Sequence, residues 1–287
     1  MHRFSFIECL NATTCFQRNT FLQPAWNGIN FTAQKSSLTT GYGRFYIINE
    51  QGDGYHPFFL KNRQISFTVD VSNVPCMTDA ALYVSSFDPV AKLADPGDFD
   101  YRASPPTGGY CDAQGFDGSA CMEMDIFEGN SAATQVTTHT CSQRTCNSFD
   151  ACDHAGCGVN SRHMPQIGPD GTVVSTRLAF KVLTRFELDN GTVGGDLVRI
   201  VQTLRQGNRI VQSAVLHDKA CVPQFGGIPK VGTALGEGMA MILSFWNLTG
   251  YAGDTWLDGG TGNPRCSRIA NQDVTVKFAN IVISPLS

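Results

Sequence analysis

Hydrophobic and polar residues alternate with a period of two along much of the chain, and this pattern predicts β-strands. In residues 64–72 (QISFTVDVS), every second residue from Ile65 to Val71 is apolar and the residues between them are mostly polar. Residues 180–188 (FKVLTRFEL) and 273–283 (DVTVKFANIVI) repeat the alternation. Each segment is therefore expected to bury one face and expose the other.

Two further segments predict strands in other settings. Residues 197–216 (LVRIVQTLRQGNRIVQSAVL) fit a hairpin that turns near Gly207-Asn208. Residues 239–246 (MAMILSFW) are continuously apolar, as in a strand covered on both faces. No amphipathic helix of ten or more residues is evident, and the Gly/Pro/Asp-rich segments 95–110 and 167–172 fit loops. The pattern predicts an all-β fold, one antiparallel β-sandwich with long, disulfide-tied loops.

Composition and charge narrow the choice of function. A chain of 287 residues that is 42% hydrophobic can bury a full core, and we expect a single domain over residues 1–287. The net charge of −4 and the pI near 5.8 argue against nucleic-acid binding, which needs a basic surface. No apolar run approaches the roughly 18 to 20 residues that cross a membrane.

Eleven cysteines are many for this length. Their spacings leave metal binding open, but CxxC pairs are absent and the six histidines are scattered, so we favour a disulfide framework. The odd count predicts one free thiol. The N-terminal MHRFSFIECL lacks the apolar region of a signal peptide, so we expect that such a peptide has been removed or lies outside this sequence. Together with the cysteines, four glycosylation sequons indicate a secreted protein, at Asn11, Asn30, Asn190 and Asn247.

The segment CMEMDIFEGN, residues 121–130, carries three acids in an apolar setting. Glu123 and Asp125 are two residues apart and would share one face of a strand. Glu128 is three residues further on and would point to the opposite face of a regular strand. One extra residue inserted between Asp125 and Glu128 as a β-bulge would turn Glu128 to the same face, and bulges are common beside active sites.

Three acids on one face have a clear catalytic use. A retaining glycosidase needs a nucleophilic carboxylate and a carboxylic acid about 5 Å apart, and a third carboxylate can separate their pKa values. The alternative is an ordinary solvated strand face, because an E-x-D-x-x-E spacing is common. The apolar neighbours Met122, Met124, Ile126 and Phe127 favour catalysis, since they place the back of this strand in a core.

The segment EMDIFEGNSAATQVTTHTC, residues 123–141, resembles the glycoside hydrolase family 7 signature, which reads E-M-D-I-W-E-A-N-S followed by T-P-H-x-C. Family 7 comprises fungal cellobiohydrolases and endoglucanases; family 16 shares the acids but not the downstream His and Cys. Residues 67–88 resemble the block D-V-S-x-L-P-C-G-x-N-G-A-L-Y. Further blocks follow in the family's order, namely GGYCDAQ (108–114), ACDHAGCGVNSR (151–162), CVPQFGG (221–227) and SFWNLTGYAGDTWLD (244–258).

This resemblance implies a concanavalin A-like jelly-roll of two antiparallel sheets and a role for each motif residue. Glu123 would be the nucleophile, Glu128 the general acid/base and Asp125 its helper, with His139 beside them. The remaining implied site residues would bind sugar, with a core-packing alternative for the two tryptophans: Tyr83, Tyr110, Asp112, Gln114, Trp246, Trp256 and Arg265.

The resemblance also implies five disulfides, Cys9–Cys15, Cys76–Cys266, Cys111–Cys121, Cys141–Cys152 and Cys157–Cys221. This set leaves Cys146 unpaired, in keeping with the odd count.

Three departures from the family pattern stand out. The family's N-terminal strands have no counterpart in the sequence, which predicts an uncovered sheet edge. The segment between GYCDAQ and CMEMD and the Cys141–Cys152 loop are short, which predicts an open cleft in place of a tunnel. Phe127 and Gly129 replace the usual Trp and Ala behind the catalytic strand, where they would alter packing more than chemistry.

These features predict a secreted, monomeric, retaining endo-β-1,4-glucanase acting on a β-glucan such as cellulose or mixed-linkage glucan, with no metal or organic cofactor. Two alternatives stay open at this stage. One is a laminarinase-like β-1,3(4)-glucanase, and the other is a non-catalytic, lectin-like glucan-binding protein.

Overall fold

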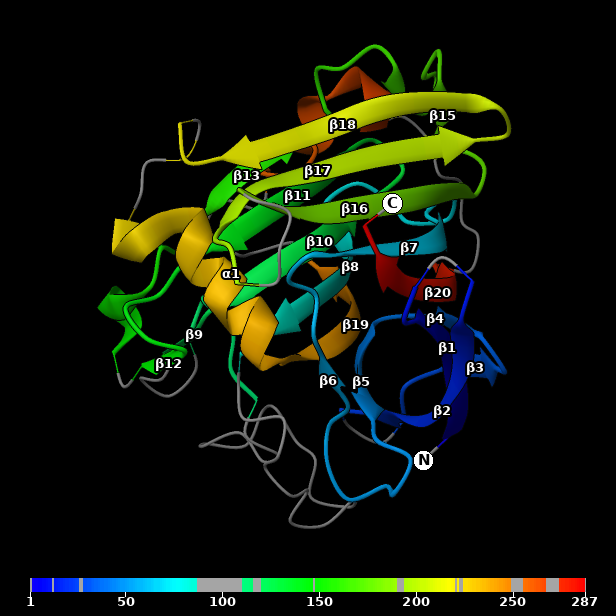
Figure 1. The fold of residues 1–287 in the computed structure, drawn as a ribbon. Helices are drawn as coiled ribbons and strands as arrows, with labels where there is room; N and C mark the ends of the chain where they lie inside the picture. The colour runs from blue at the N-terminus through cyan, green and yellow to red at the C-terminus, as the bar shows by residue number, and fades with distance from the viewer. Residues whose placement is uncertain are drawn as a thin grey trace.

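The computed structural model describes residues 2–11, 13–25, 28–86, 110–115, 120–146, 148–189, 194–219, 221, 224–248, 255–266 and 274–286. The loop expected at 95–110 lies outside these residues except for Tyr110. Within the described residues the structure is a curved β-sandwich with one α-helix (Figure 1). No helix in this part of the chain is long and apolar enough to span a membrane.

The two layers of the sandwich are joined by hydrogen bonds into one strongly curved sheet. The layer that carries the acids runs in the order β13 (Cys157–Asn160), β11 (Thr134–His139), β10 (Glu123–Gly129), β8 (Thr78–Ser85), β19 (Met239–Asn247) and β5 (Gly43–Ile48). The opposite layer runs in the order β20 (Val276–Pro285), β7 (Arg63–Asp70), β16 (Phe180–Leu188), β17 (Leu197–Gln206) and β18 (Arg209–His217).

Strands β1 (His2–Cys9) and β2 (Cys15–Pro24) connect the two layers, because β2 pairs with β5 and β1 pairs with β20. The expected all-β sandwich of antiparallel strands is confirmed, with a departure at this junction, where the β1–β20 pairing is parallel. The prediction of an uncovered sheet edge is also wrong here, since residues 2–24 cover the edges of both β5 and β20. The N-terminal segment gave no clear alternation from which these strands could be predicted.

Smaller elements complete the described structure. The short strands are β3 (Phe31–Gln34), β4 (Ser37–Thr40), β6 (Pro57–Phe58), β9 (Ala120–Cys121), β12 (Thr145–Cys146), β14 (Ile167–Gly168) and β15 (Val174–Ser175). The 3₁₀ turns are η2 (Phe149–Ala151), η3 (Gln224–Gly226), η4 (Gly260–Gly262) and η5 (Pro264–Cys266).

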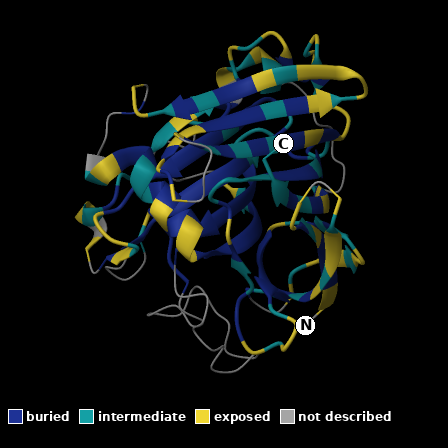
Figure 2. Ribbon diagram, in the orientation of Figure 1, coloured by how far each residue is buried: buried dark blue, intermediate teal, exposed yellow. Residues whose placement is uncertain are grey.

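The alternating segments form the strands that they predict. β7 and β16 pair in register, and β17 and β18 form the expected hairpin, in which Gln206 pairs with Arg209 around Gly207-Asn208. The apolar segment at β19 is buried along seven consecutive residues, as a strand covered on both faces should be. Figure 2 shows the resulting buried interior between the layers.

Helix α1 (Gly227–Glu237) contradicts the expectation that helices of ten or more residues are absent. Its buried face includes Ile228, Val231 and Leu235, at helical spacing. This helix is not evident from the sequence, because its residues include three glycines and a proline, which are poor helix formers. One of the glycines has a packing role, since a Cβ on Gly232 would lie 2.3 Å from Cβ of Leu197 on β17.

The back of β10 packs against the opposite layer and so holds the acid-bearing strand in place. The Phe127 ring lies 6.0 Å from that of Phe67 and 6.1 Å from that of Phe180. The Gln202 side chain on β17 donates a 2.6 Å hydrogen bond to the carbonyl of Ile126, crossing from one layer to the other. These contacts make β10 a rigid support for side chains on its other face.

We predict that Gly129→Ala destabilises the protein by about 1–3 kcal/mol, the usual cost of overpacking a core. A Cβ on Gly129 would lie 2.6 Å from Cζ of the buried Phe127 ring. The control is Gly194→Ala, because no heavy atom lies within 4 Å of a Cβ built on Gly194. Urea unfolding of both variants measures the difference, and equal free energies of unfolding would contradict the packing described here.

Candidate active site

A β-bulge in β10 places all three acids of the central motif in one pocket. β10 pairs with β11 through Glu123–His139 and Asp125–Thr137 and then resumes at Glu128–Gln135, so the register shifts between Asp125 and Glu128. Its pairing with β8 shifts at the same place. Glu123, Asp125 and Glu128 all line a pocket of about 490 Å³. The predicted bulge is confirmed, and the extra residue goes into the core, where Ile126 and Phe127 are both fully buried.

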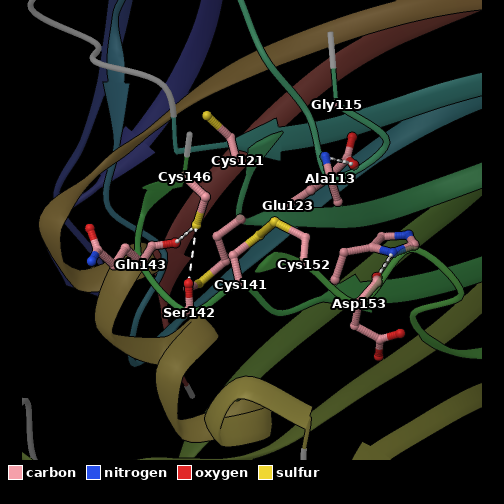
Figure 3. Close-up of a disulfide and its surroundings, with 12 residues drawn as sticks. Ala113, Gly115, Cys121, Glu123, Cys141, Ser142, Gln143, Cys146, Cys152 and Asp153 are labelled. Carbon is pink, nitrogen blue, oxygen red and sulfur yellow. Dashed lines mark hydrogen bonds between the residues drawn. A yellow bond between two sulfur atoms is a disulfide. The ribbon is translucent and has the colours of Figure 1, made fainter. Parts of the chain in front are cut away.

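Glu123 is buried but has groups that stabilise its ionised form. The backbone N–H of Ala113 donates a 3.0 Å hydrogen bond to its Oε2 (Figure 3). Burial raises the pKa of Glu123 well above its ordinary value, and Asp125 and Asp112 raise it further. The Ala113 N–H and the guanidinium of Arg44 oppose this rise. Of the two glutamates, Glu123 is thus better supported as an anion.

Asp125 and His139 form an ion pair at the centre of the pocket, with 3.1 Å between Oδ2 and Nε2. Burial raises the pKa of Asp125, and the contact with His139 opposes this. Burial alone would lower the pKa of His139, but its hydrogen bond to Asp125 and the charge of Asp125, with a smaller contribution from Asp153, outweigh burial and the net shift is upward. Asp125 and His139 therefore form a charged, hydrogen-bonded link between β10 and β11.

The other ring nitrogen of His139 is fixed from behind. Nδ1 lies 2.8 Å from the carbonyl oxygen of Asp153, so it is the protonated donor in this contact. Asp153 directly follows Cys152, whose disulfide to Cys141 is shown beside the site in Figure 3. Gly156 gives the ring its space, because a Cβ there would lie 2.6 Å from Cε1 of His139.

Glu128 lies among like charges. Its Oε2 accepts a 3.1 Å hydrogen bond from the Thr137 hydroxyl. Burial raises the pKa of Glu128 well above its ordinary value, and Asp125, Asp79 and Glu123 raise it further, while Thr137 opposes the rise. Since no cation is among the groups that lower its pKa, Glu128 is, of the three acids on β10, the one best suited to hold a proton near neutral pH.

One wall of the pocket is a chain of polar groups. The hydroxyls of Tyr83 and Tyr110 are 2.9 Å apart, and Tyr110 donates a 2.6 Å hydrogen bond to Oδ2 of Asp112. Burial raises the pKa of both phenols, so they stay protonated. Gln114 lines the pocket and donates to the carbonyl of His154 at 3.0 Å. Tyr83, Asp112 and Gln114 line the pocket directly, and Tyr110 supports them from behind.

Two tryptophans also reach the pocket. Trp246 follows the buried part of β19, and Trp256 comes from the turn at residues 255–258. Asp258 anchors this turn by accepting 2.7 Å hydrogen bonds from the Met77 N–H and the Asn130 side chain. Both tryptophans are half-buried, so each keeps part of its ring surface exposed. These positions suit the sugar-stacking role that the resemblance implies.

Arg265 does not line this pocket. Its guanidinium donates hydrogen bonds to the carbonyls of Met164 and Ile167, each at 2.9 Å. The resemblance-based placement of Arg265 in the cleft is therefore corrected, because these bonds hold the side chain in a structural position. A sign of this in the sequence is that the spacing between Arg265 and Cys266 differs from that in the family.

Among the pocket residues that were not identified from the sequence are two that carry charge, Arg44 and Asp79. Arg44 on β5 is buried, with its guanidinium carbon 3.7 Å from the ring centroid of Tyr110 and 4.4 Å from that of Trp246. Asp79 on β8 is a fourth buried acid of the pocket. Both lie within apolar strand segments, and a single charged residue in such a segment is the feature of the sequence that could have indicated a site.

All five expected disulfides are present in the structure, and Cys146 is free and buried. Glu123, Asp125 and His139 bring potential metal-ligand atoms within 4.8 Å of one another. Asp125 and His139 already contact each other, and Glu123 accepts the Ala113 N–H, so these atoms are engaged internally. The expectation of no cofactor stays a prediction.

A β-sandwich that brings two glutamates into one pocket beside half-buried tryptophans fits a glycoside hydrolase, whose catalysis uses a pair of carboxyl groups. The sequence profile of glycosyl hydrolase family 7 matches residues 27–117 and 114–217. The chain belongs to this family.

Relatives and solved structures agree with this assignment. The chain is 31% identical over 316 residues to endoglucanase EG-1 of Hypocrea jecorina, covering 95% of this chain and 66% of that protein. It is 30% identical over 285 residues to a probable endo-beta-1,4-glucanase celB of Aspergillus flavus, covering 83% and 68%. The chain thus spans about two thirds of the length of these relatives.

Among solved structures, an endoglucanase I complexed with cellobiose superimposes with a TM-score of 0.82 at 20% identity, covering 100% of this chain and 97% of that chain. A family 7 cellobiohydrolase from Daphnia pulex superimposes with a TM-score of 0.80 at 18% identity, covering 99% and 97%. At these identities the structures show a shared fold.

We predict that Thr137→Val moves the alkaline limb of the pH–activity profile to higher pH. The Thr137 hydroxyl stabilises the ionised form of Glu128, so its removal raises the pKa of Glu128 and keeps the acid protonated further into the alkaline range. The measurement is kcat/KM against pH on a soluble β-glucan.

The matched control is Thr138→Val on the same strand, because Thr137 and His139 line the pocket and the intervening residue does not. We expect its profile to coincide with that of the unmodified protein. A Thr137→Val profile with an unmoved limb, or one moved to lower pH, would show that this hydrogen bond does not tune the acid.

Proposed function

We propose that the chain is a secreted, retaining endo-β-1,4-glucanase that cleaves internal bonds of cellulose or mixed-linkage β-glucan. The observation that carries the proposal is the placement of Glu123 and Glu128 in one pocket by the bulge in β10. Their surroundings favour opposite protonation states, as an acid and a nucleophile require.

The reaction would proceed in two steps. Glu128 protonates the leaving glycosidic oxygen while the Glu123 carboxylate attacks the anomeric carbon, which breaks the glycosidic bond and forms a glycosyl-enzyme ester. Glu128, now ionised, takes a proton from water, whose oxygen attacks the same carbon. The ester breaks, Glu123 leaves as carboxylate, and the sugar departs with its original configuration.

Two features support retention over inversion. The charge of Glu123 contributes to the raised pKa of Glu128, so the two carboxyls sense each other directly. Asp125, held by His139, lies between the two glutamates in the strand and would orient the nucleophile.

The walls of the pocket suit a glucan. Trp246 and Trp256 offer flat apolar faces to the C–H faces of a pyranose, and Asp112 and Gln114 offer hydrogen-bond partners to its hydroxyls. Endo action is supported by the relatives described above, which are endoglucanases, and by the short Cys141–Cys152 connection. We also propose that the protein is a monomer.

Secretion is supported by the five disulfides, which persist in oxidising environments. Three of the four sequon asparagines, Asn11, Asn30 and Asn247, are exposed, as glycan attachment requires. The fourth, Asn190, lies outside the described residues.

The proposal is tested with carboxymethyl-cellulose, barley mixed-linkage glucan and laminarin, with Glu123→Gln as the inactive control. We expect reducing ends from the first two substrates, a rapid fall in viscosity, and β-anomeric products by proton NMR. Products from laminarin alone would favour a β-1,3-glucanase. Binding without turnover on any substrate would favour the lectin-like alternative.

We further predict that Glu128→Gln lowers kcat on glucan by about 10²–10⁴-fold, the usual worth of general acid–base catalysis. The first step should recover on an aryl cellobioside whose leaving group needs no proton, seen as a burst of the phenol. Glu50→Gln, at an exposed position, is the control and should change neither rate. An equal loss of activity on glucan and on the aryl cellobioside would contradict the acid role of Glu128.

A further inference from the structure

Five carboxyl groups line the catalytic pocket, and the mechanism above gives no role to one of them, Asp79. Asp79 on β8 lines the same pocket as the three acids of β10 and is only 5% exposed. The family block that residues 67–88 resemble has asparagine at this position. A buried acid is costly unless its surroundings use its charge or its proton, so Asp79 calls for a functional explanation.

The backbone holds Asp79 beside the acid/base. Its Oδ1 accepts a 3.1 Å hydrogen bond from the N–H of Gly129, the residue that follows Glu128. Glu128 itself pairs with Ala81, whose side chain is a single methyl group. Asp79 is the next residue along the same face of β8, so it is the carboxyl that this strand presents to Glu128.

The charges around Glu128 come from every element that packs against the pocket. Asp79 comes from β8, Glu123 and Asp125 from β10, Asp112 from the segment at 110–115, His139 from β11 and Arg44 from β5. Tyr83 and His154 also line the pocket. The described carboxyls outnumber the cations Arg44 and protonated His139, so an added negative charge acts against ionisation of Glu128.

We propose that Asp79 is a positioning residue for Glu128. As pH rises and Asp79 ionises, the negative charge of Asp79 holds the proton on the Glu128 carboxyl and extends the working range of the site toward neutral pH. The inference rests on the proposed function, because it concerns the acid of that reaction. In support, Asp79 follows burial and Asp125 among the causes that raise the pKa of Glu128. Asp79 would thus act on the chemistry without touching the scissile bond.

The first test is the pH profile of kcat/KM for Asp79→Asn on mixed-linkage glucan. The substitution keeps the size of the side chain and its acceptor for the Gly129 N–H, and it removes only the charge. We expect the alkaline limb to move to lower pH, and activity on that limb falls about tenfold for each pH unit of movement. The rate at the acidic optimum should stay close to that of the unmodified protein.

Asp170→Asn is the matched control, since it removes the same charge at a side chain that is 88% exposed. Its profile should coincide with that of the unmodified protein. An alkaline limb that stays in place in Asp79→Asn, while the unmodified protein hydrolyses glucan, would overturn the inference and leave the proposed function standing.

A second measurement does not depend on turnover. Burial, with Asp125, raises the pKa of Asp79 well above its ordinary value, so the folded protein binds a proton there that the unfolded chain releases. This contribution to stability is present at low pH and is lost as pH rises through the folded-state pKa. Asp79→Asn should therefore raise Tm more at pH 7 than at pH 4.

The interaction between the two acids is measured by repeating the comparison in a Glu128→Gln background. We expect the gain in Tm at pH 7 to be smaller there, because removing the charge of Asp79 can no longer ease the ionisation of a carboxyl at residue 128. Equal gains in both backgrounds would overturn the inference even if the protein proved to have no glucanase activity. Absence of turnover together with a smaller gain would reject the proposed function and keep the Asp79–Glu128 interaction.

Discussion

The site depends on one extra residue in one strand. Without the bulge between Asp125 and Glu128, the side chain of Glu128 would point into the core between the layers, and Glu123 would have no acid opposite it. The bulge is stable because its additional residue is apolar and is accommodated in the core. Ile126 and Phe127 both pack in the interior. Core packing on one face of β10 thus determines the chemistry on the other.

The second constraint is electrostatic. Four buried carboxyls repel one another, and burial alone would push all of them toward the neutral form. The surrounding groups stabilise the ionised forms of these acids to different degrees. Glu123 accepts a hydrogen bond from a backbone N–H and lies in the field of Arg44, and Asp125 pairs with His139. Glu128 accepts a hydrogen bond from a single hydroxyl. The sandwich and the disulfides beside the site hold these groups together at the expense of some stability, as is common at active sites.

The strands could largely be predicted because alternation records which face is buried, as in β7, β16 and the β17–β18 hairpin. Helix α1 could not be predicted, since Gly232 is needed for its close approach to β17, and helix propensity does not reveal such a contact. The acids of β10 were found from spacing and resemblance, whereas Asp79 and Arg44 join the pocket only through pairing between distant strands. Arg265 was misplaced because its partners are backbone carbonyls, which leave no trace in side-chain patterns.

The most direct test of the central claim is to trap the glycosyl-enzyme with a 2-deoxy-2-fluoro-cellobioside carrying a good leaving group. The fluorine slows both steps, and the leaving group restores the first, so the covalent intermediate accumulates. Peptide mass spectrometry should find the added disaccharide on Glu123. A label on Glu128 or Asp125, or turnover of glucan with inversion and no label, would contradict the account.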